Sequence, residues 1–191
     1  MNQRDLLDVD WTRIPAPEDD GAAVHLAGRT IPPVTLAATD GTSVTLSELP
    51  GRLVVFAYPR TGEPGKIALV DDWDLIPGAR GCTPQTCSFR DLFAELRGAG
   101  ARGVFGLSTQ STAYQAEMAG RLHLPFPVLS DEQLELTNAL HLPTMEVAGL
   151  TLMKRLALII DDARISHVFY PVFPPDRNAG DVLAWLQRHP A

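Results

Sequence analysis

The chain has 191 residues, a length that favours one compact domain with an extension. Its 45% hydrophobic and 20% charged residues are typical of a globular protein and exclude a disordered one. The 16 basic and 23 acidic side chains give a net charge of −7, which argues against nucleic acids or anionic membranes as partners. Apolar stretches stay well short of the roughly 20 residues that cross a bilayer, and residues 1–13 lack the pattern of a secretory signal. These features predict a cytoplasmic, soluble protein.

The first predicted elements follow an N-terminal extension. Residues 1–29 contain prolines and an acidic patch and are interpreted as that extension, so the domain is expected at residues 30–191. Residues 34–46 form two β-prone runs joined by Asp40 and Gly41, which predicts a hairpin. The apolar run at 53–59 is typical of a strand buried on both faces.

The remainder of the chain alternates between helical and strand patterns. Apolar residues at helical spacing predict a helix at 87–100. Further strands are expected at 103–108, 126–131, 155–161 and 164–170, and further helices at 114–122, 132–140 and 181–187. The apolar stretch at 145–153 suits either a pocket wall or ordinary core. This order predicts an α/β fold whose helices flank a sheet with a parallel centre.

Cys82 and Cys87 are the two cysteines of the sequence, and both lie near a predicted helix start. The segment GCTPQTCSFRD follows a long loop, which places Cys82 in the first helical turn. Free backbone N–H groups and the positive end of the helix dipole favour a thiolate there. Cys82 is therefore the candidate reactive residue.

The spacing of the two cysteines does not allow a disulfide within an intact helix. Helical positions five apart have Cα atoms about 8.7 Å from each other, whereas a disulfide needs about 4.4–6.8 Å. A bond between Cys82 and Cys87 would require the first turn to unwind, which suits a redox cycle better than a permanent cross-link. An inert, buried Cys87 is an equal alternative. No histidine lies near enough in sequence to complete a zinc site, so no metal is expected.

Residues 30–188 resemble the peroxiredoxins, most closely the Q-type (bacterioferritin comigratory protein-like) subfamily. The matching stretches, in family order, are LxxLPGRLVVFAYP, GCTPQTCSFRD, GLSTQSTAYQ, LPFPVLSD and KRLALIIDDARISHVF. The resemblance implies a thioredoxin-like fold, with a central mixed β-sheet flanked by helices and no cofactor. It also implies reduction of hydrogen peroxide or organic hydroperoxides through a peroxidatic cysteine.

The resemblance assigns roles to individual residues by motif position. Cys82 matches the peroxidatic cysteine, and Cys87 matches the resolving cysteine that some members place five residues later. Arg155 matches the arginine that faces the thiolate, and Pro59 matches the proline that closes the Phe-x-Tyr-Pro strand. Gln85 falls on a Glu/Gln position of the cysteine-bearing helix.

One stretch departs from the family pattern. Peroxiredoxins place Pro-x-x-x-Thr-x-x-Cys in one tight loop, whereas here residues 60–81 separate Pro59 from Cys82. The simplest interpretation is an insertion at residues 61–80 between the two halves of the motif. Thr61 then supplies the missing hydroxyl, and Thr83 is the less favoured donor.

The predicted reaction is a thiol peroxidase cycle. The Cys82 thiolate attacks the peroxide and becomes a sulfenic acid, Cys87 resolves it as an intramolecular disulfide, and a thioredoxin-like dithiol restores both thiols. Two alternatives stay open: a peroxide sensor or relay that passes its disulfide to a partner, and a catalytically silent thioredoxin-fold binding module. The protein is expected to work as a monomer or a homodimer.

Overall fold

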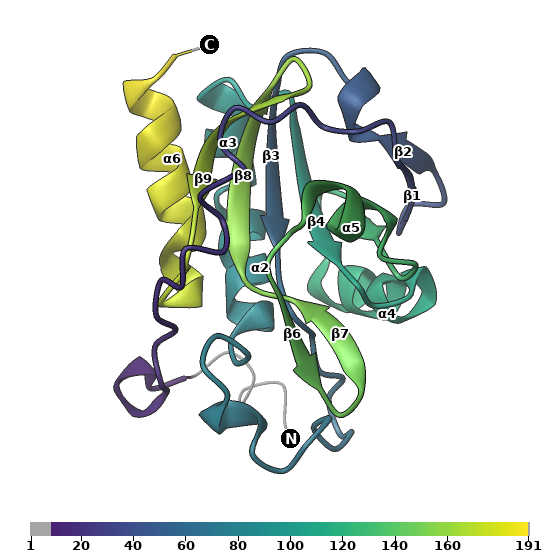
Figure 1. Cartoon of the computed structure of the whole chain (residues 1–191), viewed down its shortest axis with the longest axis vertical. Coiled ribbons are helices and arrows are strands. Elements are labelled where there is room, and N and C mark those ends of the chain that lie inside the picture. Colours follow the sequence, from purple (N-terminus) through teal and green to yellow (C-terminus); the bar gives the residue numbers. More distant parts are fainter. Residues whose placement is uncertain (1–8, 191) are drawn as a thin grey trace.

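The structure is a computed structural model and describes residues 9–190 of the chain. A seven-stranded sheet runs in the order β2-β1-β5-β4-β3-β8-β9, and a separate β6–β7 hairpin lies at one end of it (Figure 1). The strands are β1 (Thr35–Ala38), β2 (Ser43–Thr45), β3 (Arg52–Ala57), β4 (Gly103–Ser108), β5 (Val128–Ser130), β6 (Thr144–Val147), β7 (Leu150–Met153), β8 (Leu156–Asp161) and β9 (Arg164–Phe169).

The helices of the described region include five α-helices and four short 3-10 helices. None of the helices in residues 9–190 has both the length and the apolar character that a bilayer crossing requires. The helices are η1 (Trp11–Arg13), η2 (Leu46–Glu48), η3 (Trp73–Leu75), α2 (Cys82–Asp91), α3 (Phe93–Gly98), α4 (Thr112–Leu122), α5 (Glu135–Leu140), η4 (Pro175–Arg177) and α6 (Asn178–Arg188).

Only the centre of the large sheet is parallel. Strand β4 pairs in parallel with β3 and with β5. The other pairings, β3 with β8, β8 with β9, β1 with β5 and β1 with β2, are antiparallel. The prediction of a central mixed sheet flanked by helices is therefore confirmed.

Strand β3 separates two apolar cores. Leu53 and Val55 belong to a core that includes α5, whereas Val54 and Phe56 belong to a core built with α2, α3, α4 and α6. Successive side chains of a strand point to opposite faces, so a continuous apolar run is what fills both cores. Phe56 stacks on Phe89 of α2, with ring centroids 4.1 Å apart, and this contact fixes the cysteine-bearing helix on the sheet.

Most predicted elements occur close to the expected residues. The hairpin at 34–46 is present as β1–β2, and β4 has the predicted bounds 103–108. The helix expected at 87–100 is instead two helices, because Leu92 adopts φ −100° and ψ 13° and leaves the helical region. The cysteine-bearing helix α2 itself begins at Cys82, as expected for a cysteine in the first turn.

The β6–β7 hairpin was not predicted. Its two-residue turn has Ala148 at φ 51° and Gly149 at φ 74°, and such turns usually carry Asn, Asp or Gly at both positions. An alanine at the first position weakens the hairpin signal, so the stretch 145–153 reads simply as apolar. The hairpin supports the insertion: Trp73 and Ala79 pack in one cluster with Val147 and Leu152 of this hairpin.

The described part of the N-terminal segment packs on the domain. Leu26 is fully buried in the core that includes α5. Nearer the start of the chain, the Trp11 indole donates a hydrogen bond to Asp176, and Asp20 forms an ion pair with Lys154 at 2.5 Å. The division into an extension at 1–29 and a domain at 30–191 stays a prediction.

Candidate active site

Cys82 is the first residue of α2 and lines a cavity. Gly81 precedes it as the N-cap residue, with φ 103°, and no side chain caps this helix start. The side chain of Cys82 is only 3% exposed. The first N–H groups of a helix lack partners within the helix and carry partial positive charge, so the sulfur lies where an anion is stabilised.

Arg155 holds a positive charge against this sulfur. Its Nη2 lies 3.2 Å from Sγ of Cys82, and the side chain is 2% exposed. Arg155 directly precedes β8, so the sheet fixes its backbone. The same nitrogen also lies within hydrogen-bond distance of the carbonyl oxygens of Gly78, Ala79 and Arg80, at 3.2, 3.3 and 3.0 Å, so its two N–H groups are shared among these acceptors. A cation beside the sulfur favours the thiolate, and the carbonyls compensate the cost of burying the guanidinium.

The other arm of the guanidinium joins a buried chain of amides. Nη1 of Arg155 donates to Oε1 of Gln85, and Nε2 of Gln85 donates to Oδ1 of Asn178 at 2.9 Å. Gln85 is fully buried, and Asn178 is 1% exposed. Helix α2 thus supplies both the sulfur and an amide that binds the arginine.

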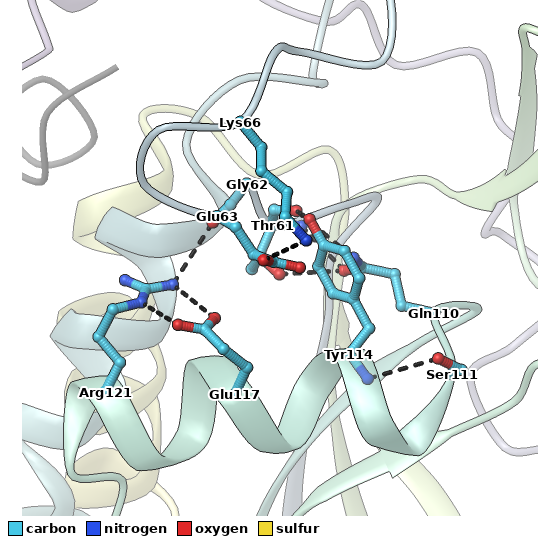
Figure 2. Close-up of polar contacts among 9 residues, drawn as sticks. All are labelled: Thr61, Gly62, Glu63, Lys66, Gln110, Ser111, Tyr114, Glu117 and Arg121. Atoms are coloured by element: carbon cyan, nitrogen blue, oxygen red, sulfur yellow. Dashed lines mark hydrogen bonds and ion pairs between the residues drawn. The ribbon is translucent and has the colours of Figure 1, made fainter.

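Thr61 is buried and held by helix α4 and the loop before it (Figure 2). Its backbone N and its hydroxyl both donate to Oε1 of Gln110, at 2.9 and 3.1 Å. The Tyr114 hydroxyl donates to the Thr61 carbonyl at 3.0 Å, and Arg121 donates to the Gly62 carbonyl at 3.4 Å. The start of the insertion is therefore fixed on α4 by several polar contacts.

A cavity of about 420 Å³ brings Cys82 and Thr61 together. The insertion closes one side of it with the apolar side chains of Ile67, Leu69 and Trp73. Trp73 is 8% exposed, and Ile67 is 91% exposed at the rim. The insertion thus separates the two halves of the motif in sequence, and in space it contributes to the lining of the cavity that contains the sulfur. The stretch 145–153 lies outside this lining.

Cys87 and Pro59 are absent from the cavity lining. Cys87 is a free thiol within the same intact helix as Cys82 and is 7% exposed. Burial, the main cause, raises the pKa of its thiol. Pro59 is buried at the end of the β3 segment, where its carbonyl accepts a hydrogen bond from Ser108. The structure therefore places Cys82 and Thr61 in the cavity lining and Arg155 against the Cys82 sulfur, outside that lining, and it keeps Cys87 in the adjoining core.

Three polar residues of the site were not predicted from the sequence. Gln110 follows β4, and the carboxyl end of a parallel strand is a common place for functional residues, so this signal was available. Tyr114 falls in a predicted helix whose pattern does not single it out. Asn178 lies far from the cysteines in sequence, and only tertiary packing places it beside Gln85.

Comparisons with known proteins agree with this geometry. The redoxin family matches residues 26–183 of the chain. The chain is 32% identical over 162 residues to a chloroplastic peroxiredoxin Q of Oryza sativa subsp. japonica, covering 84% of this chain and 66% of the rice protein. It thus spans about two thirds of that relative's length. It is also 31% identical over 168 residues to the peroxiredoxin Bcp of Escherichia coli, covering 85% of this chain and 96% of that protein.

The fold has relatives among solved structures as well. The peroxidoxin BcpB of Mycobacterium tuberculosis superimposes with a TM-score of 0.68 at 27% identity, covering 86% of this chain and 98% of that one. The fold is accordingly the thioredoxin-like α/β fold, as the sequence resemblance implies.

Gly81→Ala is expected to destabilise the protein. A Cβ at this position would lie 2.6 Å from Pro175 and 2.7 Å from the Trp11 ring, and the backbone has φ 103°. Strain and overpacking together should lower the free energy of unfolding by at least about 2 kcal/mol, measured by urea denaturation. Gly120→Ala is the control, because its Cβ would meet nothing within 4 Å. Equal stability of the two variants would contradict the prediction.

Alkylation should distinguish the two cysteines. At pH 7, iodoacetamide is expected to modify Cys82 at least about tenfold faster than Cys87. Arg155 lies against the Cys82 sulfur, which lines the cavity, whereas burial raises the pKa of Cys87. Peptide mass spectrometry over time measures both rates, and in the urea-unfolded chain they should become similar. Faster modification of Cys87 in the folded protein would contradict this assignment.

Proposed function

The chain belongs to the redoxin family, with its relatives among the peroxiredoxins of the Q/Bcp type, and from this premise we propose that it is a thiol peroxidase whose reactive residue is Cys82. The observation that carries the proposal is the contact between Nη2 of Arg155 and Sγ of Cys82 at the start of α2, beside a cavity. Positive charge at the sulfur and access for a small molecule are the two requirements of a thiolate nucleophile.

The chemical step is a nucleophilic attack on the peroxide. The Cys82 thiolate forms a bond to the distal oxygen while the O–O bond breaks, which gives a sulfenic acid and an alkoxide or hydroxide. That leaving group takes a proton and departs as alcohol or water. Arg155 stabilises the charge that grows on the leaving oxygen. Its Nε is buried and has no hydrogen-bond partner among residues 9–190, so a donor of the guanidinium is not used by the described protein.

Thr61 is proposed to orient the peroxide. Its hydroxyl donates to Gln110, so the oxygen keeps lone pairs that can accept a hydrogen bond from the hydroperoxide O–H. It lies in the wall of the cavity that contains Cys82. These two facts support Thr61 as the hydroxyl that the sequence otherwise lacks before the cysteine. Pro59 is proposed to act only by ending the strand that leads to Thr61.

Resolution by Cys87 is the second part of the proposal. Both cysteines lie in the intact helix α2, where positions five apart are too distant for a disulfide, at about 8.7 Å between Cα atoms. We expect the first turn of α2 to unwind after oxidation, so that Cys87 attacks the sulfenic acid and water leaves. A thioredoxin-like dithiol then reduces the disulfide by exchange. The cytoplasmic location and the monomeric or dimeric state remain predictions.

The apolar wall of the cavity supports organic hydroperoxides as substrates beside hydrogen peroxide. Hydrogen peroxide fills only a small part of a cavity of about 420 Å³. Ile67, Leu69 and Trp73 offer apolar surface to an organic substituent on the leaving oxygen. Burial of that substituent favours binding in proportion to the apolar area removed from water.

Single cysteine variants test the cycle. Cys82→Ser should abolish peroxide consumption, because no other described thiol lines the cavity. Cys87→Ser should complete one turnover in stopped-flow measurements and leave a sulfenic acid that dimedone traps. Normal recycling of Cys87→Ser by thioredoxin would exclude Cys87 as the resolving residue. If the unchanged protein consumes no peroxide, the result favours the catalytically silent binding module. A mixed disulfide with a partner protein in cells would favour the peroxide relay.

The rim residue Ile67 should affect substrate choice. Ile67→Ser is expected to lower kcat/KM for cumene hydroperoxide about fivefold, from the loss of about 1 kcal/mol of apolar contact, and to leave kcat/KM for hydrogen peroxide unchanged. Leu75→Ser is the matched control, because Leu75 is an exposed apolar residue of the same insertion outside the cavity lining. An equal loss for both substrates would exclude a role in selectivity.

A further inference from the structure

The residue that ends the buried amide chain, Asn178, has no role in the cycle described so far. It is the first residue of α6, is 1% exposed, and accepts a hydrogen bond from Gln85 at 2.9 Å. Gln85 in turn accepts from Arg155, whose other terminal nitrogen contacts the sulfur of Cys82. Asn178 is therefore connected to the reactive sulfur through two buried side chains.

The orientation of the Gln85 amide follows from its partners. A guanidinium has only donors, so Gln85 must present its oxygen to Arg155. Its Nε2 then points the other way, and a buried N–H without an acceptor carries a substantial cost. Oδ1 of Asn178 is the acceptor that the structure provides. By accepting from Nε2, Asn178 stabilises the orientation of the Gln85 amide in which its oxygen accepts from Arg155.

The contact with Gln85 also sets the direction of the guanidinium. All the other described hydrogen bonds of Arg155 use Nη2, which meets three backbone carbonyls and the Cys82 sulfur. The bond from Nη1 to Gln85 is the second point that prevents the planar group from turning about Nη2. Without it, only the contacts of Nη2 and the side-chain torsions of Arg155 hold the guanidinium, so its plane can turn relative to the sulfur.

We propose that Asn178 is a positioning residue for the peroxidatic centre: it orients Gln85, and Gln85 holds Arg155 in the plane that faces the Cys82 sulfur. This proposal rests on the proposed role of Cys82 and adds a residue from the C-terminal helix to the site. It also makes α6 a support for the first turn of α2. Gln85 must break its contact with Asn178 when that turn unwinds.

Asn178→Leu tests the proposal, because it keeps a similar volume and removes the acceptor. The second-order rate constant of Cys82 with hydrogen peroxide should fall about tenfold, the order expected when a buried donor is left unpaired. The pH profile of Cys82 alkylation by iodoacetamide should shift to higher pH, because Arg155 no longer faces the sulfur. A change in both readouts supports positioning, and unchanged readouts overturn it.

Two further variants separate positioning from loss of stability. Val182→Ala shortens a fully buried apolar side chain of the same helix and leaves Asn178, Gln85 and Arg155 unchanged. It should lower the unfolding midpoint and leave the peroxide rate and the alkylation profile unchanged. Asn178→Asp keeps an acceptor for Gln85 and should recover most of the rate. If Val182→Ala slows the reaction as much as Asn178→Leu, the effect is structural and the proposal fails.

A double-mutant cycle with Gln85→Glu gives the sharpest test. A carboxylate at position 85 accepts from Arg155 and has no N–H that needs Asn178. Asn178→Leu should therefore cost about tenfold in the otherwise unchanged protein and less than about twofold in the Gln85→Glu variant. Equal losses in both backgrounds would show that Asn178 does not act through Gln85.

The outcome for Asn178 is distinguishable from that for the proposed function. If the unchanged protein does not reduce peroxide, the peroxidase proposal fails, and the alkylation profile of Cys82 still decides whether Asn178 orients Arg155. If the unchanged protein reduces peroxide, and Asn178→Leu has the same peroxide rate constant and the same alkylation profile as the unchanged protein, only the positioning role is overturned.

Discussion

The contact between the Arg155 guanidinium and the Cys82 sulfur is the interaction on which the rest of the site depends. Neither partner is placed by its own local sequence alone. Cys82 lies at the start of α2, a helix that Phe89 fixes on the sheet. Arg155 directly precedes β8, so the sheet holds its backbone. A sheet pairing, β3 with β8, keeps these two supports in register. The position of the arginine beside the sulfur thus depends on the packing of the central strands.

The insertion at 61–80 changes the sequence around this contact without displacing it. Peroxiredoxin motifs keep the threonine close to the cysteine along the chain, whereas the proposed counterpart here, Thr61, is separated from Cys82 in sequence and is held beside the cavity by contacts with Gln110 and Tyr114. The excess chain is absorbed by packing Trp73 and its neighbours on the β6–β7 hairpin. The hairpin is therefore a structural requirement of the insertion, and the insertion in turn gives the cavity its apolar side.

The sequence predicted the parts of the fold that have regular patterns. The apolar run of β3 and the helical spacing after Cys82 predicted buried elements. The motif resemblance singled out Arg155 and Thr61, which lie against the Cys82 sulfur and in the cavity lining, and their roles stay a prediction. The β6–β7 hairpin was missed, because Ala148 in its turn gives little local signal. Asn178 could not be found for a different reason: its role exists only where α6 meets α2, and no local pattern encodes that contact.

The proposed cycle places two opposing requirements on helix α2. In that cycle the thiolate needs an intact first turn, whereas a disulfide with Cys87 needs that turn to open. The later part of α2 is fixed by apolar contact, with Phe89 stacked on Phe56. The first turn also makes polar contacts, from Arg155 to Cys82 and to Gln85. In the proposed cycle, conversion of the thiolate to a neutral sulfenic acid removes the charge that attracts Arg155, so oxidation would weaken one of the contacts at this turn. Under this proposal, the arginine that activates the sulfur also makes the opening of the helix depend on the reaction.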